Sequence, residues 1–413
     1  MARAVPLEKL TTVQRAPRVR RVALAYSGGL DSSLCVALLR EVYGVEEVVP
    51  ITVDVGQGAD ELDAAARTAA VLGITPRVID AREEFARDWL APAIRANADY
   101  LGYPVATAMT RQLIARLVAE QAVALGCDGL AEGSSGKGND QYRMHNVFTL
   151  FAPGLPILVP VRDLDLTRTE ERALCAHFGI PVDEPIPGGD DKTLWCRSIA
   201  SGGLGLDTPI PDAVWRWYVP PERAPDRPAT VTLTFTGGIP VALNGTPMAL
   251  ADLVDALNVL AGGYGIGRID ILEDGIMGLK SREVYEAPAA TVVLRAHRDL
   301  EQLTLTKEEV QFKRGIDQAW AALVYHGDWF HPLRADLDAF IGRSQEVVEG
   351  EVSLRLYKGS MEVVARASRQ SLFAPELRSI ATGGFDQRLC GPAAQIRGLP
   401  YQVLALRRAR AKA

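Results

Sequence analysis

One short stretch, residues 27–33, combines the residue types that bind phosphate groups. Serine hydroxyls flank two adjacent glycines, Gly28 and Gly29, and Asp31 follows them. An apolar run at 21–25 precedes the stretch and a helical pattern follows it, so the turn opens a helix N-terminus. Adjacent glycines let the backbone approach a ligand, and a helix N-terminus favours an anion. We therefore predict a phosphate-binding loop.

The spacing separates this loop from the two commonest nucleotide motifs. It lacks the Lys of a P-loop and the G-x-G-x-x-G of dinucleotide-binding proteins. Its S-G-G-x-D-S pattern resembles the pyrophosphate loop of the ATP pyrophosphatases, which split ATP into AMP and pyrophosphate. A glycine-rich turn with an Asp/Ser cap is the alternative, so other stretches must decide.

A second loop, residues 133–141, has similar properties. Three glycines permit close backbone approach, Lys137 and Arg143 add positive charge, and Asn139 and Asp140 add directed hydrogen bonds. Alone, the string is equally compatible with a mobile surface loop. Together with the first loop on one sheet edge, it favours a nucleotide site.

The elements around these loops alternate between strand and helix from residue 21 to about 185. After the first strand, we expect further strands at 48–54, 77–80, 129–131 and 157–161. Thr107 is expected to cap a long helix, and Thr167 with Glu170 to form a capping box. Such alternation predicts an α/β fold with an open parallel sheet, whose ligands bind beyond the carboxyl ends of the strands.

The rest of the chain has a different pattern. Residues 186–375 read as an α+β domain, with strand 230–236 and a hairpin formed by 352–357 and 362–367. Beyond about 376 the periodicity fades, which predicts an arm. The predicted segments are 1–20, a basic tail; 21–185, the nucleotide-binding domain; 186–375, the synthetase domain; and 376–413, the C-terminal arm.

Bulk properties exclude several classes of function. The net charge of −6 gives no electrostatic footprint for nucleic acid, and no apolar run is long enough for a membrane span. Five cysteines without a C-x-x-C pair indicate free thiols in a reducing compartment, and five histidines show no ligand spacing. We expect a cytoplasmic protein with no metal site of its own. A transit peptide in the first 20 residues is the alternative to a disordered tail.

Several motifs in one order resemble the argininosuccinate synthase family. They are Ala25-Tyr26-Ser27-Gly28-Gly29-Leu30-Asp31, Asp54-Val55-Gly56-Gln57, Gly136-Lys137-Gly138-Asn139-Asp140-Gln141, Gly267-Arg268-Ile269-Asp270, Lys280-Ser281-Arg282 and Tyr285-Glu286-Ala287-Pro288. The resemblance implies a Mg²⁺- and ATP-dependent C–N ligase that condenses citrulline with aspartate in arginine biosynthesis, and a homotetramer. It implies that the ureido oxygen attacks the α-phosphorus, giving a citrullyl-adenylate and pyrophosphate, before the aspartate amine displaces AMP.

The resemblance also implies residue roles. The catalytic positions are Asp31, Lys137, Asn139 and Asp140. The ATP-binding positions are Ala25, Tyr26, Ser27, Gly28, Gly29, Asp31, Ser32, Ser33, Val53, Gly133 and Gly136. Aspartate would contact Thr107, Ser135, Asn139 and Asp140. Citrulline would contact Tyr103, Asn139, Arg143, Ser198, Glu273 and Tyr285. Mg²⁺ would arrive with ATP.

The chain departs from the family pattern at a few positions. Gly189 stands where a citrulline-binding serine is usual, Ser135 replaces a threonine, and Gln112 replaces a proline. Residues 389–392 replace a pattern in the family's intersubunit arm, which bears on the homotetramer. Two alternatives follow: a paralogue that adenylates a different ureido or carbonyl acceptor, and a nucleotide-binding homologue without catalysis.

Overall fold

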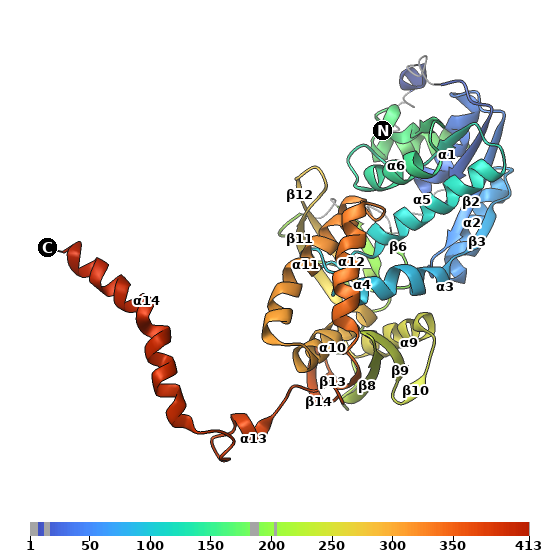
Figure 1. Ribbon diagram of the computed structural model, residues 1–413. Coiled ribbons are helices and arrows are strands. Elements are labelled where there is room, and N and C mark those ends of the chain that lie inside the picture. Colours follow the sequence, from blue (N-terminus) through green and yellow to red (C-terminus); the bar gives the residue numbers. More distant parts are fainter. Residues whose placement is uncertain (1–6, 12–16, 182–189, 202–204, 413) are drawn as a thin grey trace. The chain divides into compact units, whose positions relative to one another are not determined.

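The computed structural model describes residues 7–11, 17–181, 190–201 and 205–412, and it is drawn in Figure 1. The chain divides into two compact units, Met1–Gln370 and Ser371–Ala413. The boundaries predicted near 185 and 375 stay predictions, and the first of them falls within 182–189, outside the described residues.

The N-terminal half of the first unit contains a five-stranded parallel sheet in the order β3-β2-β1-β4-β5. Its strands are β1 (Arg21–Ala25), β2 (Glu47–Asp54), β3 (Arg77–Asp80), β4 (Gly129–Ala131) and β5 (Ile157–Leu158). The predicted open parallel sheet is therefore confirmed.

Helices cover both faces of this sheet. Successive side chains of a strand point to opposite faces, and both faces of this sheet carry apolar residues that the helices bury. Val22 and Leu24 of β1 pack with α1 and α8, whereas Ala23 packs in the larger core with α5. The helices of this half are α1 (Leu30–Glu41), α2 (Ala59–Val71), α3 (Arg82–Glu84), a π-helical turn (Phe85–Leu90), α4 (Ala91–Arg95), α5 (Ala106–Ala124), α6 (Asp140–Phe151), α7 (Pro160–Asp163) and α8 (Arg168–His177). A short 3₁₀ helix (Leu7–Thr11) precedes β1.

The other half of the first unit is α+β, with two antiparallel sheets. One sheet has the order β10-β9-β8-β13-β14 and the other β11-β12-β7-β6. Its strands are β6 (Asp190–Lys192), β7 (Arg197–Ser201), β8 (Ala229–Thr236), β9 (Ile239–Leu243), β10 (Thr246–Pro247), β11 (Arg268–Asp274), β12 (Lys280–Glu286), β13 (Gly350–Tyr357) and β14 (Ser360–Ala367). Its helices are a 3₁₀ turn (Asp212–Val214), α9 (Leu250–Gly263), α10 (Pro288–Thr304), α11 (Lys307–His326) and α12 (Pro332–Gln345).

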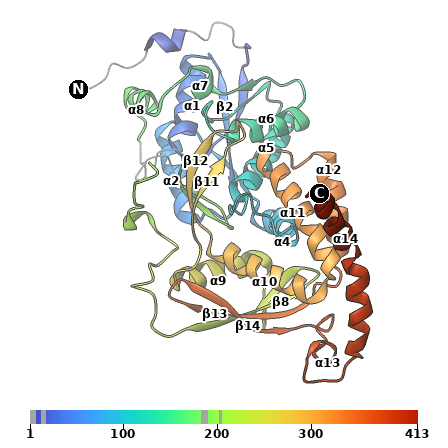
Figure 2. The ribbon, with the colours of Figure 1, turned by 90° about the vertical axis from the view of Figure 1, so that its left-hand side faces the viewer.

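In this half, α9 and α10 lie over the β8–β14 sheet, as Figure 2 shows. The strands β13 and β14 form the predicted hairpin, which turns at Lys358 and Gly359.

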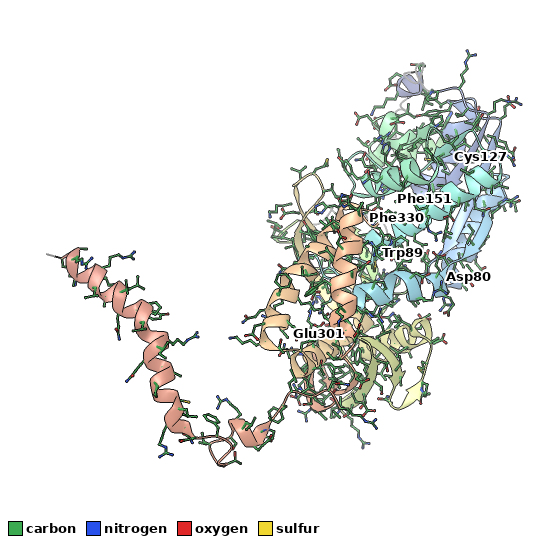
Figure 3. All side chains as sticks on the ribbon, viewed as in Figure 1. Asp80, Trp89, Cys127, Phe151, Glu301 and Phe330 are labelled. Atoms are coloured by element: carbon green, nitrogen blue, oxygen red, sulfur yellow. The ribbon has the colours of Figure 1, made fainter. Side chains whose placement is uncertain are left out.

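Aromatic packing joins the two halves of the first unit. Trp89 from the π-helical turn stacks on Trp329, which follows α11, with ring centroids 4.0 Å apart. Phe151 at the end of α6 meets Phe330 edge-on at 4.8 Å, and Figure 3 shows these side chains close together. This packing buries large apolar rings at the junction and so supports a fixed relation between the two halves.

Two local predictions differ from the structure. Residues 157–161 are only briefly a strand, because Pro160 occupies the first turn of α7. Thr107 lies inside α5, and the Tyr103 hydroxyl accepts hydrogen bonds from the N–H groups of Thr107 (2.6 Å) and Ala108 (3.4 Å). The second unit contains α13 (Pro375–Arg378), a 3₁₀ turn (Gln387–Leu389) and α14 (Cys390–Arg410), and the arm predicted for 376–413 stays a prediction. The predicted capping box at Thr167 and Glu170 is present.

No helix in the described part of the chain combines the length and apolar composition needed to cross a bilayer.

Candidate active site

The first glycine loop joins β1 to α1, and its own residues form hydrogen bonds with one another. The Ser27 hydroxyl accepts a hydrogen bond from the Gly29 N–H at 3.3 Å and lies 3.1 Å from the Ser32 hydroxyl. Gly28 has a φ of 77°, and an added Cβ there would lie 2.3 Å from the Ala65 Cα. Glycine is therefore required at this position, both for the backbone conformation and for the approach of α2.

The second glycine loop lies directly against the first. A Cβ on Gly133 would lie 3.1 Å from the backbone of Asp31 and Ser32, at the start of α1. The Gly136 position approaches Arg162 of α7, and Lys137 is exposed. As predicted, both loops follow the carboxyl ends of neighbouring parallel strands, β1 and β4.

The other residues predicted to bind ATP lie at or near this edge of the sheet. Tyr26 is buried, and its hydroxyl donates to the Ala65 carbonyl of α2 at 3.4 Å. Val53 is buried within β2, and Ala25 ends β1. Asp31 forms an ion pair with Arg168 of α8. Ser33 is buried within α1.

A cluster of arginines and carboxylates begins where the second loop enters α6. Asp140 accepts a hydrogen bond from Arg111 at 2.8 Å and another from Arg143 at 2.8 Å. Arg111 also donates to Asp191 at 2.6 Å. Burial raises the pKa of the Asp140 carboxyl, but the two guanidinium groups outweigh it and hold that pKa below its usual value. Asp140 is thus a carboxylate fixed between two cations.

A chain of hydrogen bonds continues from this cluster into the α+β half. Arg143 donates from Nε to the Tyr325 carbonyl at 2.9 Å, and its guanidinium lies over the Tyr325 ring. The Tyr325 hydroxyl accepts from Asn139 Nδ2 at 3.0 Å and donates to Glu273 Oε1 at 2.7 Å. The Tyr285 hydroxyl donates to the other Glu273 oxygen at 3.0 Å.

At the Glu273 end of this hydrogen-bonded network, burial has the largest effect on the pKa of the carboxyl group. Glu273 is 3% exposed, and burial raises the pKa of its carboxyl, although the hydrogen bonds from Tyr325 and Tyr285 partly oppose that effect. Tyr103 stacks on Tyr285 with ring centroids 4.4 Å apart. The result is a buried polar cluster, flanked by aromatic rings, in which the Glu273 carboxyl group lies near Arg143.

The structure brings most of the predicted substrate residues into this region. Ser198 of β7 lies opposite Tyr285 in the antiparallel pair, so the two residues share a sheet face. Thr107, in the first turn of α5, donates its N–H to the Tyr103 hydroxyl, and Ser135 precedes Asn139 in the second loop. Gly189, the predicted departure from the family, lies outside the described residues.

Two residues in the network, Arg111 and Tyr325, were not predicted as site residues from the sequence. Arg111 lies four residues after Thr107 on α5, so helical spacing from a predicted contact was the available signal. Tyr325 lies in the last turn of α11 and meets Asn139 only through long-range packing, for which the local sequence has no marker.

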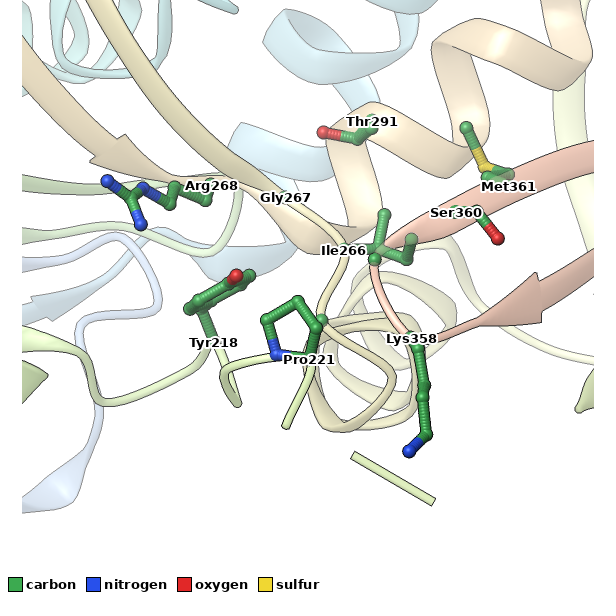
Figure 4. A pocket seen from close by; sticks show the side chains of 11 residues that line it. Tyr218, Pro221, Ile266, Gly267, Arg268, Thr291, Lys358, Ser360 and Met361 are labelled. Carbon is green, nitrogen blue, oxygen red and sulfur yellow. The ribbon is translucent and has the colours of Figure 1, made fainter. Parts of the chain in front are cut away.

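A cavity of about 540 Å³ lies away from this network, with Arg268 and Lys358 on opposite sides of it (Figure 4). Both cations are already engaged: Lys358 pairs with Asp226 at 2.6 Å, and Arg268 lies over the Trp215 ring. The cavity contains no predicted site residue.

Among the described residues, no group of three His, Cys, Asp or Glu side chains could hold a metal ion.

The parallel sheet with two glycine loops at the carboxyl ends of its strands defines an α/β protein of the nucleotide-binding class. A family model described as the arginosuccinate synthase N-terminal HUP domain matches residues 21–181, and one described as the arginosuccinate synthase C-terminal domain matches residues 190–404.

Curated relatives agree with these matches. The argininosuccinate synthase of Methanopyrus kandleri is 47% identical over 396 residues, covering 94% of this chain and 99% of the relative. That of Synechococcus elongatus is 44% identical over 397 residues, covering 94% and 98%. That of Methanosarcina acetivorans is 44% identical over 373 residues, covering 90% and 94%.

The chain belongs to the argininosuccinate synthase family. It is an ATP-dependent C–N ligase that condenses citrulline with aspartate in arginine biosynthesis, which confirms the predicted family, fold and reaction.

Proposed function

We propose that the two glycine loops hold ATP while the hydrogen-bonded chain from Asp140 to Glu273 holds the two amino acids. The backbone N–H groups of residues 27–33 and the N-terminus of α1 would bind the departing pyrophosphate. Exposed Lys137 in the second loop would approach the phosphates from the other side.

The proposed amino-acid sites follow from the charges around the network. Citrulline would place its α-ammonium at Glu273 and its carboxylate at Arg143, between Tyr103, Tyr285 and Ser198. Aspartate would lie nearer the loop, at Thr107, Ser135, Asn139 and Asp140. Asp140 already accepts bonds from two arginines, and each of its oxygens keeps a second acceptor position for a ligand donor.

The chemistry needs positioning more than it needs a nucleophilic side chain. The citrulline ureido oxygen attacks the α-phosphorus and pyrophosphate leaves. The aspartate amine then attacks the ureido carbon, and AMP leaves with that oxygen. Oriented donors that meet the developing charge supply most of the stabilisation in such transfers. The protein's part is to hold the ureido oxygen in line and to keep both amino acids still.

One observation carries the proposal: Asn139 joins the two predicted amino-acid sites. Its Nδ2 donates to the Tyr325 hydroxyl, which bonds to Glu273, and its Oδ1 accepts from the Ile276 N–H at 2.9 Å. Asp140, the next residue, forms the arginine cluster. A residue predicted to contact both substrates therefore lies where both could meet.

The test is product analysis with purified protein, ATP, aspartate and a panel of ureido compounds. We expect AMP, pyrophosphate and argininosuccinate in equal amounts with citrulline. AMP release only with another acceptor would identify a paralogue. No pyrophosphate with any acceptor would indicate a nucleotide-binding homologue without catalysis.

Three further proposals complete the predicted function. Mg²⁺, which prefers oxygen ligands, would enter with ATP and be held chiefly by phosphate oxygens, where it would offset their charge. The family resemblance also supports a homotetramer, which light scattering coupled to size exclusion would check. It supports a cytoplasmic location as well, which fractionation of the source cells would check.

A further inference from the structure

Glu283 is a second carboxyl group on the sheet face that carries the proposed citrulline site. It lies on β12 between Ser281 and Tyr285, and alternate strand residues share a face. On the neighbouring strand β11, Ile271 lies opposite Glu283 and Glu273 lies opposite Ser281. The bond from Tyr285 to Glu273 therefore crosses the row in which Glu283 sits.

The Glu283 carboxyl is buried and poorly partnered. It is 6% exposed, and its one hydrogen bond within the described part of the chain comes from the Ser281 hydroxyl at 2.7 Å. It joins no ion pair there. A buried carboxylate normally has a cation or several donors, because desolvation without them is costly. Glu283 thus points to a missing partner.

The described groups around Glu283 do not supply that partner. Those that influence its charge are Glu273 from β11, Ser281 from its own strand and Arg143 from α6. Arg143 is already bonded to Asp140 and to the Tyr325 carbonyl. Tyr103 and Cys196 lie in the same region, where they help to raise the pKa of the Tyr285 hydroxyl. Two carboxyl groups therefore lie near each other, and Arg143, the cation among the described residues that acts on both, is bonded elsewhere.

We propose that Glu283 is an acceptor-binding residue, which together with Glu273 holds the cationic ammonium end of the acceptor amino acid. This inference rests on the proposed function of the network and names a residue that the family resemblance did not assign. It implies that the site discriminates in favour of acceptors with an ammonium group, because an acceptor without one leaves two buried carboxyl groups without a cation.

The arrangement predicts a pH dependence. Burial raises the pKa of the Glu283 carboxyl to about 7, against the lowering effect of the Ser281 hydrogen bond. The empty site therefore holds Glu283 protonated below that pH and ionised above it. If only the ionised form binds the ammonium, the competent fraction is about 0.1 at pH 6 and about 0.9 at pH 8, so the KM for citrulline should fall roughly tenfold.

The experiment measures the KM for citrulline from pH 6 to pH 8, at saturating ATP and aspartate, with wild type, Glu283→Gln and Ser281→Ala. Wild-type formation of argininosuccinate is established first, so that failure of the proposed function is seen separately. We expect Glu283→Gln to raise the KM at pH 8 and to flatten the profile. Ser281→Ala should move the midpoint to higher pH, because it removes the bond that favours the carboxylate.

Other causes of a pH dependence are separated by the same design. The two variants change only residues 281 and 283, so a slope with another origin would survive Glu283→Gln. A wild-type KM and an unchanged profile in Glu283→Gln would overturn the proposal. Should that variant fail to fold by thermal unfolding, an unmoved midpoint in Ser281→Ala would overturn it instead.

Discussion

The Tyr325 hydroxyl offers the sharpest test of the network, because Tyr325→Phe removes one oxygen and keeps the ring. That oxygen donates to Glu273 at 2.7 Å and accepts from Asn139 at 3.0 Å, and the remaining ring still stacks on Tyr100. The substitution therefore frees one oxygen of a buried carboxyl group and one amide donor without opening a large cavity.

The expected size of the effect follows from the charge on Glu273. A hydrogen bond to a charged group contributes about 1.5–3 kcal/mol, or roughly 10- to 150-fold in an equilibrium. Tyr285 still donates to the other carboxyl oxygen, so we expect the lower end, about a tenfold rise in the KM for citrulline. The KM for aspartate should rise less, because Asn139 keeps its bond from Ile276.

The assay is pyrophosphate release under initial-rate conditions, with each amino acid varied in turn. Tyr100→Phe is the matched control: its ring stacks on Tyr325 at 3.8 Å, but its hydroxyl reaches only the Asp274 carbonyl at 3.3 Å. Thermal unfolding of both variants reports any general loss of structure. Equal KM values for citrulline in Tyr325→Phe, Tyr100→Phe and wild type would refute the reasoning.

Three further substitutions test the parts that support the site. Gly28→Ala should abolish ATP binding in calorimetry, because its Cβ would collide with α2, whereas Gly44→Ala, with a similar φ of 69° and open space, should not. Arg197→Met should lower the free energy of unfolding in urea by about 3–5 kcal/mol, because it leaves the carboxyl of Glu286 buried without its cation. Gln112→Leu should lower the free energy of unfolding by about 1–3 kcal/mol in the same assay, because the buried N–H of Trp329 loses its hydrogen bond to Gln112. No change would mean that water replaces the side chain.

Much of the fold could be predicted because its signals are local. Buried apolar strands followed by glycine turns specify the parallel sheet, and the Thr167–Glu170 capping box marks the start of α8. Pro160 ended the last strand of that sheet early, since its ring is suited to the first turn of a helix. Residues 390–410 lack a clear apolar face and contain Pro400, and they form α14 nonetheless.

The site was only partly predictable, because its decisive contacts are long-range. The glycine loops have sequence signatures, but Tyr325 meets Asn139 across 186 positions of the chain. Gln112 is a similar case. It was noted as a departure from the family, yet its role becomes visible only when its amide bonds the Val324 carbonyl and the Trp329 N–H, tying α5 to the end of α11.

The most direct test of the whole account follows a single oxygen atom. Citrulline labelled with ¹⁸O in the ureido group is incubated with the protein, ATP and aspartate, and the nucleotide product is examined by mass spectrometry. We predict AMP that carries the label, because the ureido oxygen attacks the α-phosphorus and leaves with it. Unlabelled AMP, or ADP with phosphate, would contradict the account.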